Sequence, residues 1–184
     1  MKRACKISLK FLTARKQRQV NALLQSYRAA VNFYIQSLWT AKGAQDADTL
    51  SRLKISRLSQ RYKQAALKQA MDIIIATKKA AKERGTSCKT PVFSGYAILD
   101  SRFVVIEKGE KSFDLSVRLS VLARGGRVVI PTKKTKVLNK WMGKPLAKVV
   151  QGCGLSESDL ILWVELPDLP EKTRSARVAR QIHK

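Results

Sequence analysis

Residues 5–11, Cys-Lys-Ile-Ser-Leu-Lys-Phe, alternate strictly between apolar and polar side chains. This period of two predicts a β-strand with one buried face and one basic, solvent-facing face. After it, Thr13 can cap a helix whose apolar side chains recur every three or four residues from Val20 to Leu38. Gly43 is placed to end that helix. The opening of the chain therefore predicts a β-fold that is interrupted by a long helix after its first strand.

Two more helical stretches follow. The first runs from Thr49 to Leu58 and the second from about Gln60 to Arg84. Ser59 can cap the second stretch, and Gly85 can end it. We expect the helices to pack together as a small bundle.

From Pro91 the apolar period changes to that of short strands separated by turn residues. The strands are expected at residues 92–93, 96–99, 103–106, 113–121, 127–130 and 160–166. Between the last two, Lys136 to Val150 is predicted to form a short helix interrupted around Gly143. The predicted fold class is α+β: a β-barrel or sandwich with a helical bundle inserted after its first strand.

The charge is strongly positive. The chain has 184 residues, with 37 Lys and Arg against 13 Asp and Glu, for a net charge of +24. A small soluble domain usually carries a net charge of about 2 to 8. Residues 1–45 and 115–156 each contain nine basic residues and no acidic residue. Because solvated surfaces normally mix both signs, these two segments favour a polyanion, first of all a nucleic acid, as partner.

Several other classes of protein are excluded on composition. Cys5, Cys88 and Cys153 are widely separated, and His183 is the only histidine, so we expect no zinc site, no cofactor and no His-dependent catalytic triad. The acidic residues are too scattered for a two-metal nuclease, so the chain alone is not expected to be an enzyme. No apolar run is long enough to span a membrane, and the start does not resemble a signal peptide, so we expect a cytoplasmic protein without a membrane partner.

One cluster of lysines surrounds a tryptophan. Trp141 is flanked by Lys133, Lys134, Lys136, Lys140, Lys144 and Lys148. We expect these lysines to contact phosphates and Trp141 to belong to the core. Tyr27, Tyr34 and Trp39 share the apolar face of the first helix, and we expect them to be core residues rather than base-stacking platforms.

The order of short motifs resembles the amino-terminal half of the transposon-associated TnpB proteins and of the compact type V CRISPR effectors related to them. The first matching segments are the strand ending Lys10-Phe11-Leu12-Thr13 and the helix with Gln17 and Tyr27–Tyr34. This helix is like the family's R-x-x-x-N helix. The later matches are the stretch Leu58–Ala70 and the strand-like segments Pro91–Phe93, Leu99–Phe103, Ser112–Leu115 and Val129–Pro131. The resemblance covers nearly the whole chain, and each motif is short.

This resemblance implies an oligonucleotide-binding-like β-barrel, the wedge domain, with a helical recognition lobe inserted after its first strand and a guide RNA held by both. The corresponding ranges are residues 1–13 for the first wedge strand, 14–85 for the recognition lobe, 86–170 for the wedge barrel and 171–184 for a basic tail or linker. In the family a RuvC-type nuclease lobe follows, with catalytic carboxylates and a zinc motif. Here the sequence ends at Lys184. A shortened piece, a natural truncation and one part of a split effector all fit this reading.

We therefore expect a guide-RNA-binding scaffold for RNA-guided DNA targeting that does not cut DNA by itself. Its partners would be the guide RNA, the target DNA duplex and either a nuclease-lobe chain or a second copy. By analogy with the family, Gln64, Lys68 and Gln69 would read base edges beside the target. The full set of predicted RNA or DNA contacts is Lys6, Lys10, Arg15, Arg18, Arg28, Arg52, Arg57, Arg61, Gln64, Lys68, Gln69, Arg127, Lys133, Lys134, Lys136, Lys140 and Lys144. The alternatives are a structural or ribosome-associated RNA-binding protein and the recognition subunit of a split nuclease.

Overall fold

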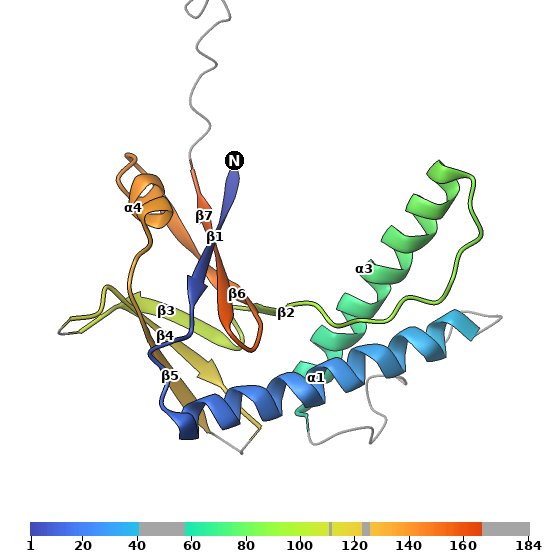
Figure 1. Cartoon of the computed structure of the whole chain (residues 1–184), viewed down its shortest axis with the longest axis horizontal. Helices are drawn as coiled ribbons and strands as arrows, with labels where there is room; N and C mark the ends of the chain where they lie inside the picture. Colours follow the sequence, from blue (N-terminus) through green and yellow to red (C-terminus); the bar gives the residue numbers. More distant parts are fainter. Residues whose placement is uncertain (41–57, 111, 123–125, 167–184) are drawn as a thin grey trace, which may run out of the picture.

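The computed structural model describes residues 1–40, 58–110, 112–122 and 126–166 (Figure 1). The described elements are β1 (Lys2–Ser8), α1 (Ala14–Thr40), α3 (Gln60–Arg84), β2 (Ala97–Asp100), β3 (Val104–Lys108), β4 (Leu115–Ser120), β5 (Arg127–Thr132), α4 (Lys136–Met142), β6 (Lys148–Leu155) and β7 (Asp159–Glu165). Both long helices lie between β1 and β2 in the chain, and all the strands pair antiparallel. The predicted α+β class is confirmed.

The capping residues mark the helix ends that the sequence predicts. The Lys16 amide lies 3.5 Å from Thr13 Oγ1 at the start of α1. Ser59 accepts a bond from the Tyr62 amide at the start of α3, and Gly85 ends α3 in the left-handed conformation with φ 62°. The predicted helix end at Gly43 lies outside the described residues, as does almost all of the stretch predicted from Thr49.

Helices α1 and α3 pack together and against the strands. Tyr62 at the start of α3 is buried, stacks on Phe103 with ring centroids 4.1 Å apart, and donates a 2.6 Å hydrogen bond to the carbonyl of Ser120. Tyr27 and Tyr34 are fully buried, as predicted for core residues. The start of α3 is therefore fixed to the strands by one aromatic side chain that uses both its ring and its hydroxyl.

One sheet has the strand order β1-β7-β6-β2. Its register aligns Cys5, Leu162, Cys153 and Leu99 in one row across all four strands, and each of these side chains is buried. The first strand runs over Lys2–Ser8, three residues earlier than predicted, because its ladder with β7 begins at the pair Lys2 and Glu165. Leu9 lies beyond the ladder but is still buried.

Strand β6 is the clearest departure from the prediction. The sequence suggested a helix over Lys136–Val150, yet α4 ends at Met142 and Lys148 begins a strand. β6 carries a register shift between Val149 and Cys153, and within it Gly152 has φ 144°. A Cβ on Gly152 would lie 2.8 Å from the carbonyl oxygen of Leu99, so a glycine is needed where β2 approaches this bulge.

The second sheet is the meander β3-β4-β5. The alternation predicted from Leu115 to Val121 is confirmed, because Leu115, Val117 and Leu119 are buried while Arg118 is exposed. Residues 92–93, predicted as a strand, lie outside the ladders. The two sheets contribute to one core, but the described strands do not close into a single barrel.

Candidate nucleic-acid interface

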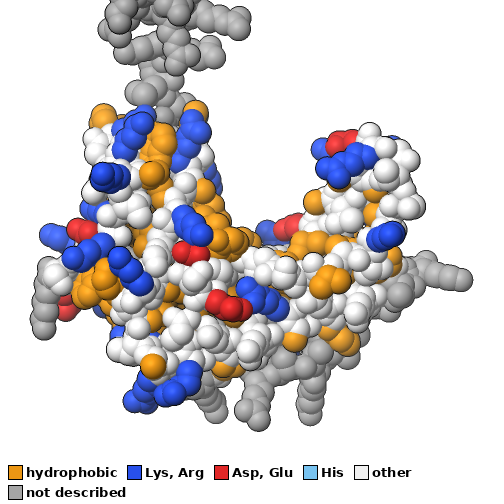
Figure 2. Space-filling view, viewed as in Figure 1, with side chains coloured by type: hydrophobic (Ala, Val, Ile, Leu, Met, Phe, Trp, Pro, Cys, Tyr) orange, Lys and Arg blue, Asp and Glu red, His pale blue; other side chains and the backbone are white. Residues whose placement is uncertain are grey.

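The strands and α3 face each other across an open hollow. In Figure 1 the strands and α4 form one arm, the C-terminal part of α3 forms the other, and α1 crosses the base. Figure 2 shows the same hollow with side chains, and Lys and Arg gather at the upper end of the strand arm. A ligand in the hollow would meet side chains from both arms.

Two polar side chains of α1 hold the helix to the strand arm. Gln17 Nε2 donates to the carbonyl of Glu157 at 2.7 Å. Arg28 Nη1 forms a 2.6 Å ion pair with Glu157 Oε1, and Arg28 Nε donates to the carbonyl of Gly95 at 3.4 Å. The Arg28 side chain is only 23% exposed. Arg28 was predicted to contact nucleic acid, but its guanidinium is engaged within the protein.

Asn32 makes a similar internal clamp one turn further along α1. Its side-chain oxygen accepts the Phe93 amide at 2.7 Å, and its Nδ2 donates to the Phe93 carbonyl at 3.0 Å. Arg28 and Asn32 are the two ends of the R-x-x-x-N pattern that carries the family resemblance. In this chain the pattern ties α1 to the segment that leads into β2.

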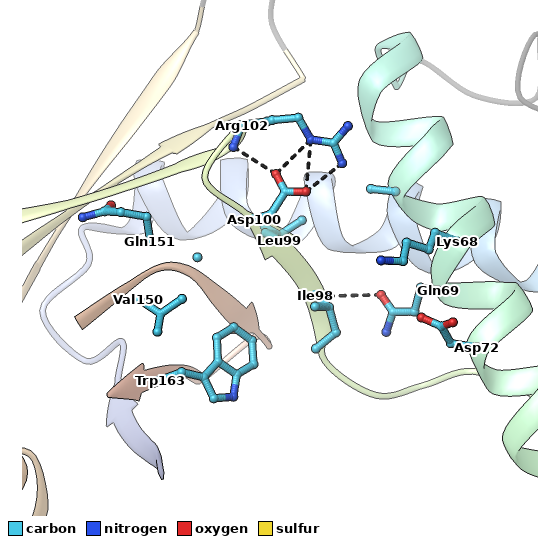
Figure 3. A pocket seen from close by; sticks show the side chains of 12 residues that line it. Lys68, Gln69, Asp72, Ile98, Leu99, Asp100, Arg102, Val150, Gln151 and Trp163 are labelled. Atoms are coloured by element: carbon cyan, nitrogen blue, oxygen red, sulfur yellow. Dashed lines mark hydrogen bonds and ion pairs between the residues drawn. The ribbon is translucent and has the colours of Figure 1, made fainter. Parts of the chain in front are cut away.

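A cavity of about 260 Å³ opens between α3 and strands β2, β6 and β7 (Figure 3). Lys68 and Asp72 line it from α3, Asp100 and Arg102 from the end of β2, and Trp163 from β7. Arg102 Nε lies 3.0 Å from both carboxylate oxygens of Asp100, and its Nη2 lies 2.7 Å from Oδ2. The hydrogen bonds from Arg102 hold the pKa of Asp100 below its usual value. Because two carboxylates stand among the two cations, this cavity has no excess positive charge.

Gln69, predicted to read bases, is also engaged internally. Its Oε1 accepts hydrogen bonds from the Tyr27 hydroxyl at 2.9 Å and the Ile98 amide at 3.1 Å. Its Nε2 donates to the Tyr96 carbonyl at 2.9 Å. The side-chain amide therefore joins α1, α3 and β2. By contrast, Gln64 and Lys68 are exposed on α3, one turn apart.

Gln151 plays the corresponding role between the two sheets. Its Oε1 accepts the Ile106 amide at 2.8 Å, and its Nε2 donates to the Ile106 carbonyl at 3.0 Å. Within the bulge of β6, the side chain thus satisfies both backbone groups of Ile106 on β3 and links the two sheets.

The lysines around α4 are arranged differently from those in the cavity. Thr135 caps α4 through a 3.2 Å bond from the Leu138 amide, and the buried side chain of Leu138 anchors the helix to the core. Around this anchor, Lys133, Lys136 and Lys140 are exposed, while Lys134 and Lys144 are half-exposed. Within the described part of the chain, none of these five ammonium groups forms an ion pair with a carboxylate.

Trp141 is half-buried rather than a full core residue as predicted. Three cations lie over its ring: Lys144 Nζ at 5.0 Å from the centroid, the Arg3 guanidinium carbon at 5.4 Å and Lys140 Nζ at 5.7 Å. Arg3 was missed by the sequence analysis. It reaches Trp141 because β1 pairs with β7, and α4 contacts β7. We call Arg3, Lys140, Trp141 and Lys144 the Trp141 cluster.

The remaining predicted contacts are spread over the surface. Lys6 pairs with Asp159 at 3.0 Å, and this hydrogen bond raises the pKa of Lys6. Lys10 Nζ lies 5.2 Å from the centroid of the Phe11 ring. Arg15, Arg18, Arg61 and Arg127 are exposed. Arg52 and Arg57 lie outside the described residues.

Many of the acidic side chains are matched to particular cations. The ion pairs are Lys6–Asp159, Arg28–Glu157, Lys79–Glu83, Arg102–Asp100 and Arg118–Glu107. These pairs lie on the two sheets, on α3 and beside α1, away from the lysines of α4. The side chains of the α4 lysines take part in none of these pairs, although Asp114 Oδ2 accepts the backbone amide of Lys134 at 2.8 Å.

No protein-family model matches this chain, and no curated protein sequence matches it either. Across the described ranges, no helix combines the length and the apolar character needed to cross a bilayer. Within the same ranges, no three His, Cys, Asp or Glu side chains are grouped as metal ligands would be.

Proposed function

We propose that this chain is a guide-RNA-binding scaffold of an RNA-guided DNA-targeting complex, of the kind found in TnpB and compact type V CRISPR systems. In this proposal it contacts the guide RNA and the DNA duplex beside the target, and it does not cut DNA by itself. The observation that carries the RNA-binding part is the lysine-rich surface of α4, whose ammonium groups have no carboxylate partners among the described residues.

The physical argument is electrostatic. Like charges at close range repel one another, so an unneutralised cluster of this size is stabilised by an anionic partner. A phosphate backbone supplies regularly spaced negative charges and releases counterions when lysines bind it. RNA helices are recognised mainly through shape, phosphates and 2′-hydroxyls, which suits a broad basic surface.

The arrangement of elements supports the assignment to a wedge and a recognition lobe. Helices α1 and α3 are inserted between β1 and β2, and two antiparallel sheets share one core. We propose that these sheets correspond to a partly open oligonucleotide-binding-like barrel. The hollow between α3 and the strands would then hold nucleic acid, with Lys68 lining it from α3 and Gln64 exposed one turn earlier on the same helix.

The experiment is to express the full chain beside its genomic neighbourhood, purify it at moderate salt and sequence the RNA that copurifies. One discrete structured RNA encoded near the gene is the expected result. Ribosomal RNA or a featureless mixture would instead favour a structural or ribosome-associated RNA-binding protein. With the RNA in hand, adding a chain that bears a RuvC-type lobe tests the split-nuclease alternative, which predicts metal-dependent cleavage of a matched target.

A further inference from the structure

The turn that follows α4 holds an apolar side chain in an unfavourable backbone conformation. The Ala147 amide donates to the Lys144 carbonyl at 3.2 Å, so Pro145 and Leu146 are the two central residues of a tight turn. Leu146 has φ 61°, and among the described residues it is the only one other than glycine with a positive φ. After a proline at the first central position, the second favours Gly or Asn when its φ is positive. A leucine here is strained.

Nothing in the packing explains this leucine. Its side chain is 78% exposed, so burial does not offset the backbone strain. It also lies close in the chain to Trp141, because a second turn, closed by a 3.2 Å bond from the Lys144 amide to the Trp141 carbonyl, immediately precedes it. An exposed apolar residue therefore follows the half-buried Trp141 by five residues, across two consecutive tight turns.

The Trp141 cluster supplies the charge at the same place. Arg3, Lys140 and Lys144 converge on one ring, and within the described residues none of them pairs with a carboxylate. The ring attracts each cation, but the three cations repel one another. A single phosphate among them would relieve that repulsion.

We propose that Leu146 and the Trp141 cluster form a binding site for an unpaired RNA nucleotide. The base lies against Leu146 and the indole, and its phosphate lies among Arg3, Lys140 and Lys144. Bases within a duplex are stacked on one another and offer no apolar face to such a side chain, whereas unpaired bases do. The inference rests on the proposed function in one respect, namely that the chain binds RNA through the surface of α4.

The test compares two RNAs and two substitutions in the full chain. Binding of a short oligouridine and of a blunt RNA duplex is measured by fluorescence anisotropy for the wild type, Leu146→Gly and Leu146→Asn. Both substitutions accept positive φ without strain, so the thermal midpoint should stay the same or rise. We expect affinity for oligouridine to fall by about fivefold to tenfold, as for loss of one apolar side-chain contact, with the duplex affinity unchanged.

The matched control is Val92→Gly, which removes another apolar side chain, 85% exposed, far along the chain from α4. It should leave both affinities unchanged. As a second readout, oligouridine should quench tryptophan fluorescence in the wild type and less so in Trp141→Phe.

The outcomes separate this inference from the function on which it rests. If the wild type binds neither RNA, the proposed function itself is wrong. If it binds both and the Leu146 variants bind oligouridine normally, only the nucleotide site is wrong. A lower thermal midpoint in both variants would make Leu146 a structural residue. Sedimentation with phosphatidylserine vesicles that depends on Leu146, with RNA binding unaffected, would make the patch a membrane contact and overturn the inference.

Discussion

The cavity beside α3 and the surface of α4 contain the same kinds of residue but use them differently. In the cavity, Arg102 is held by Asp100, and Lys68 also acts on the Asp100 carboxylate and lowers its pKa. Around α4, Lys133, Lys136 and Lys140 are exposed and have no carboxylate partner within the described residues. A Lys or Arg side chain is therefore available to an anionic ligand only where no carboxylate of the protein already pairs with it.

The largest expected effect is on stability, at Gln69. Gln69→Ala leaves the Tyr27 hydroxyl, the Ile98 amide and the Tyr96 carbonyl without their partner. Because the Tyr27 hydroxyl is buried while the Ile98 and Tyr96 backbone groups lie near the surface, we expect the free energy of unfolding to fall by about 2 kcal/mol. Urea denaturation of the two proteins measures this difference.

Gln64→Ala is the matched control for Gln69→Ala. It changes the same residue type on the same helix at an exposed position, so its effect should stay within about 0.5 kcal/mol. Equal stability losses at the two positions would show that Gln69 does not join the helices to β2 as described.

A smaller effect is expected at Arg28. Arg28→Met removes the ion pair with Glu157 while keeping much of the side-chain volume, and we expect a loss of about 1 kcal/mol. The salt dependence of RNA binding should not change, since the guanidinium is occupied. Normal stability combined with a shallower salt dependence would identify Arg28 as an RNA contact after all.

The smallest effect is on the pH dependence of stability. Hydrogen bonds from Arg102 lower the pKa of Asp100, and those from Ser158 and then Lys6 lower the pKa of Asp159. A carboxyl whose pKa is lower in the folded state stabilises the fold above its unfolded pKa of about 4. That contribution disappears as the pH falls through the folded-state value. Arg102 and Asp100 are both exposed, and so is Lys6 beside Asp159, so each pair contributes less than about 1 kcal/mol.

Asp100→Asn should therefore flatten the decline in thermal midpoint below about pH 4, with little change at neutral pH. The measurement is a series of thermal melts at decreasing pH for the two proteins. An acid decline as steep as that of the wild type would mean that the Asp100–Arg102 pair adds nothing to the fold.

Much of the fold was predictable because local signals agreed with the tertiary structure. Ser59 and Gly85 mark the ends of α3, and the alternation in β4 matches its buried face. Strand β6 was missed because Gly152 and Gly154 resemble a break in a strand. Only the pairing with β2 reveals that Gly152 is required by a close backbone approach.

The site was less predictable, since it depends on partners distant in sequence. The sequence around Arg28 does not indicate that its ion-pair partner is Glu157, which lies 129 residues away. Arg3 and Trp141 come together because β1 pairs with β7 and α4 contacts β7. Charge composition predicted a basic surface, but it could not tell the occupied cations from the free ones.

The salt dependence of binding to a blunt RNA duplex tests whether the lysines before and on α4 contact phosphates. The first variant replaces Lys133, Lys134 and Lys136 by Ala and so removes three cations that have no carboxylate partner among the described residues. The second variant replaces Lys79, Arg102 and Arg118 by Ala and removes three cations that are paired with carboxylates. Each lost phosphate contact lowers the slope of log K against log salt by nearly one, so the first variant should lose roughly three units at most and the second less than one. Equal slopes in the two variants would contradict the account.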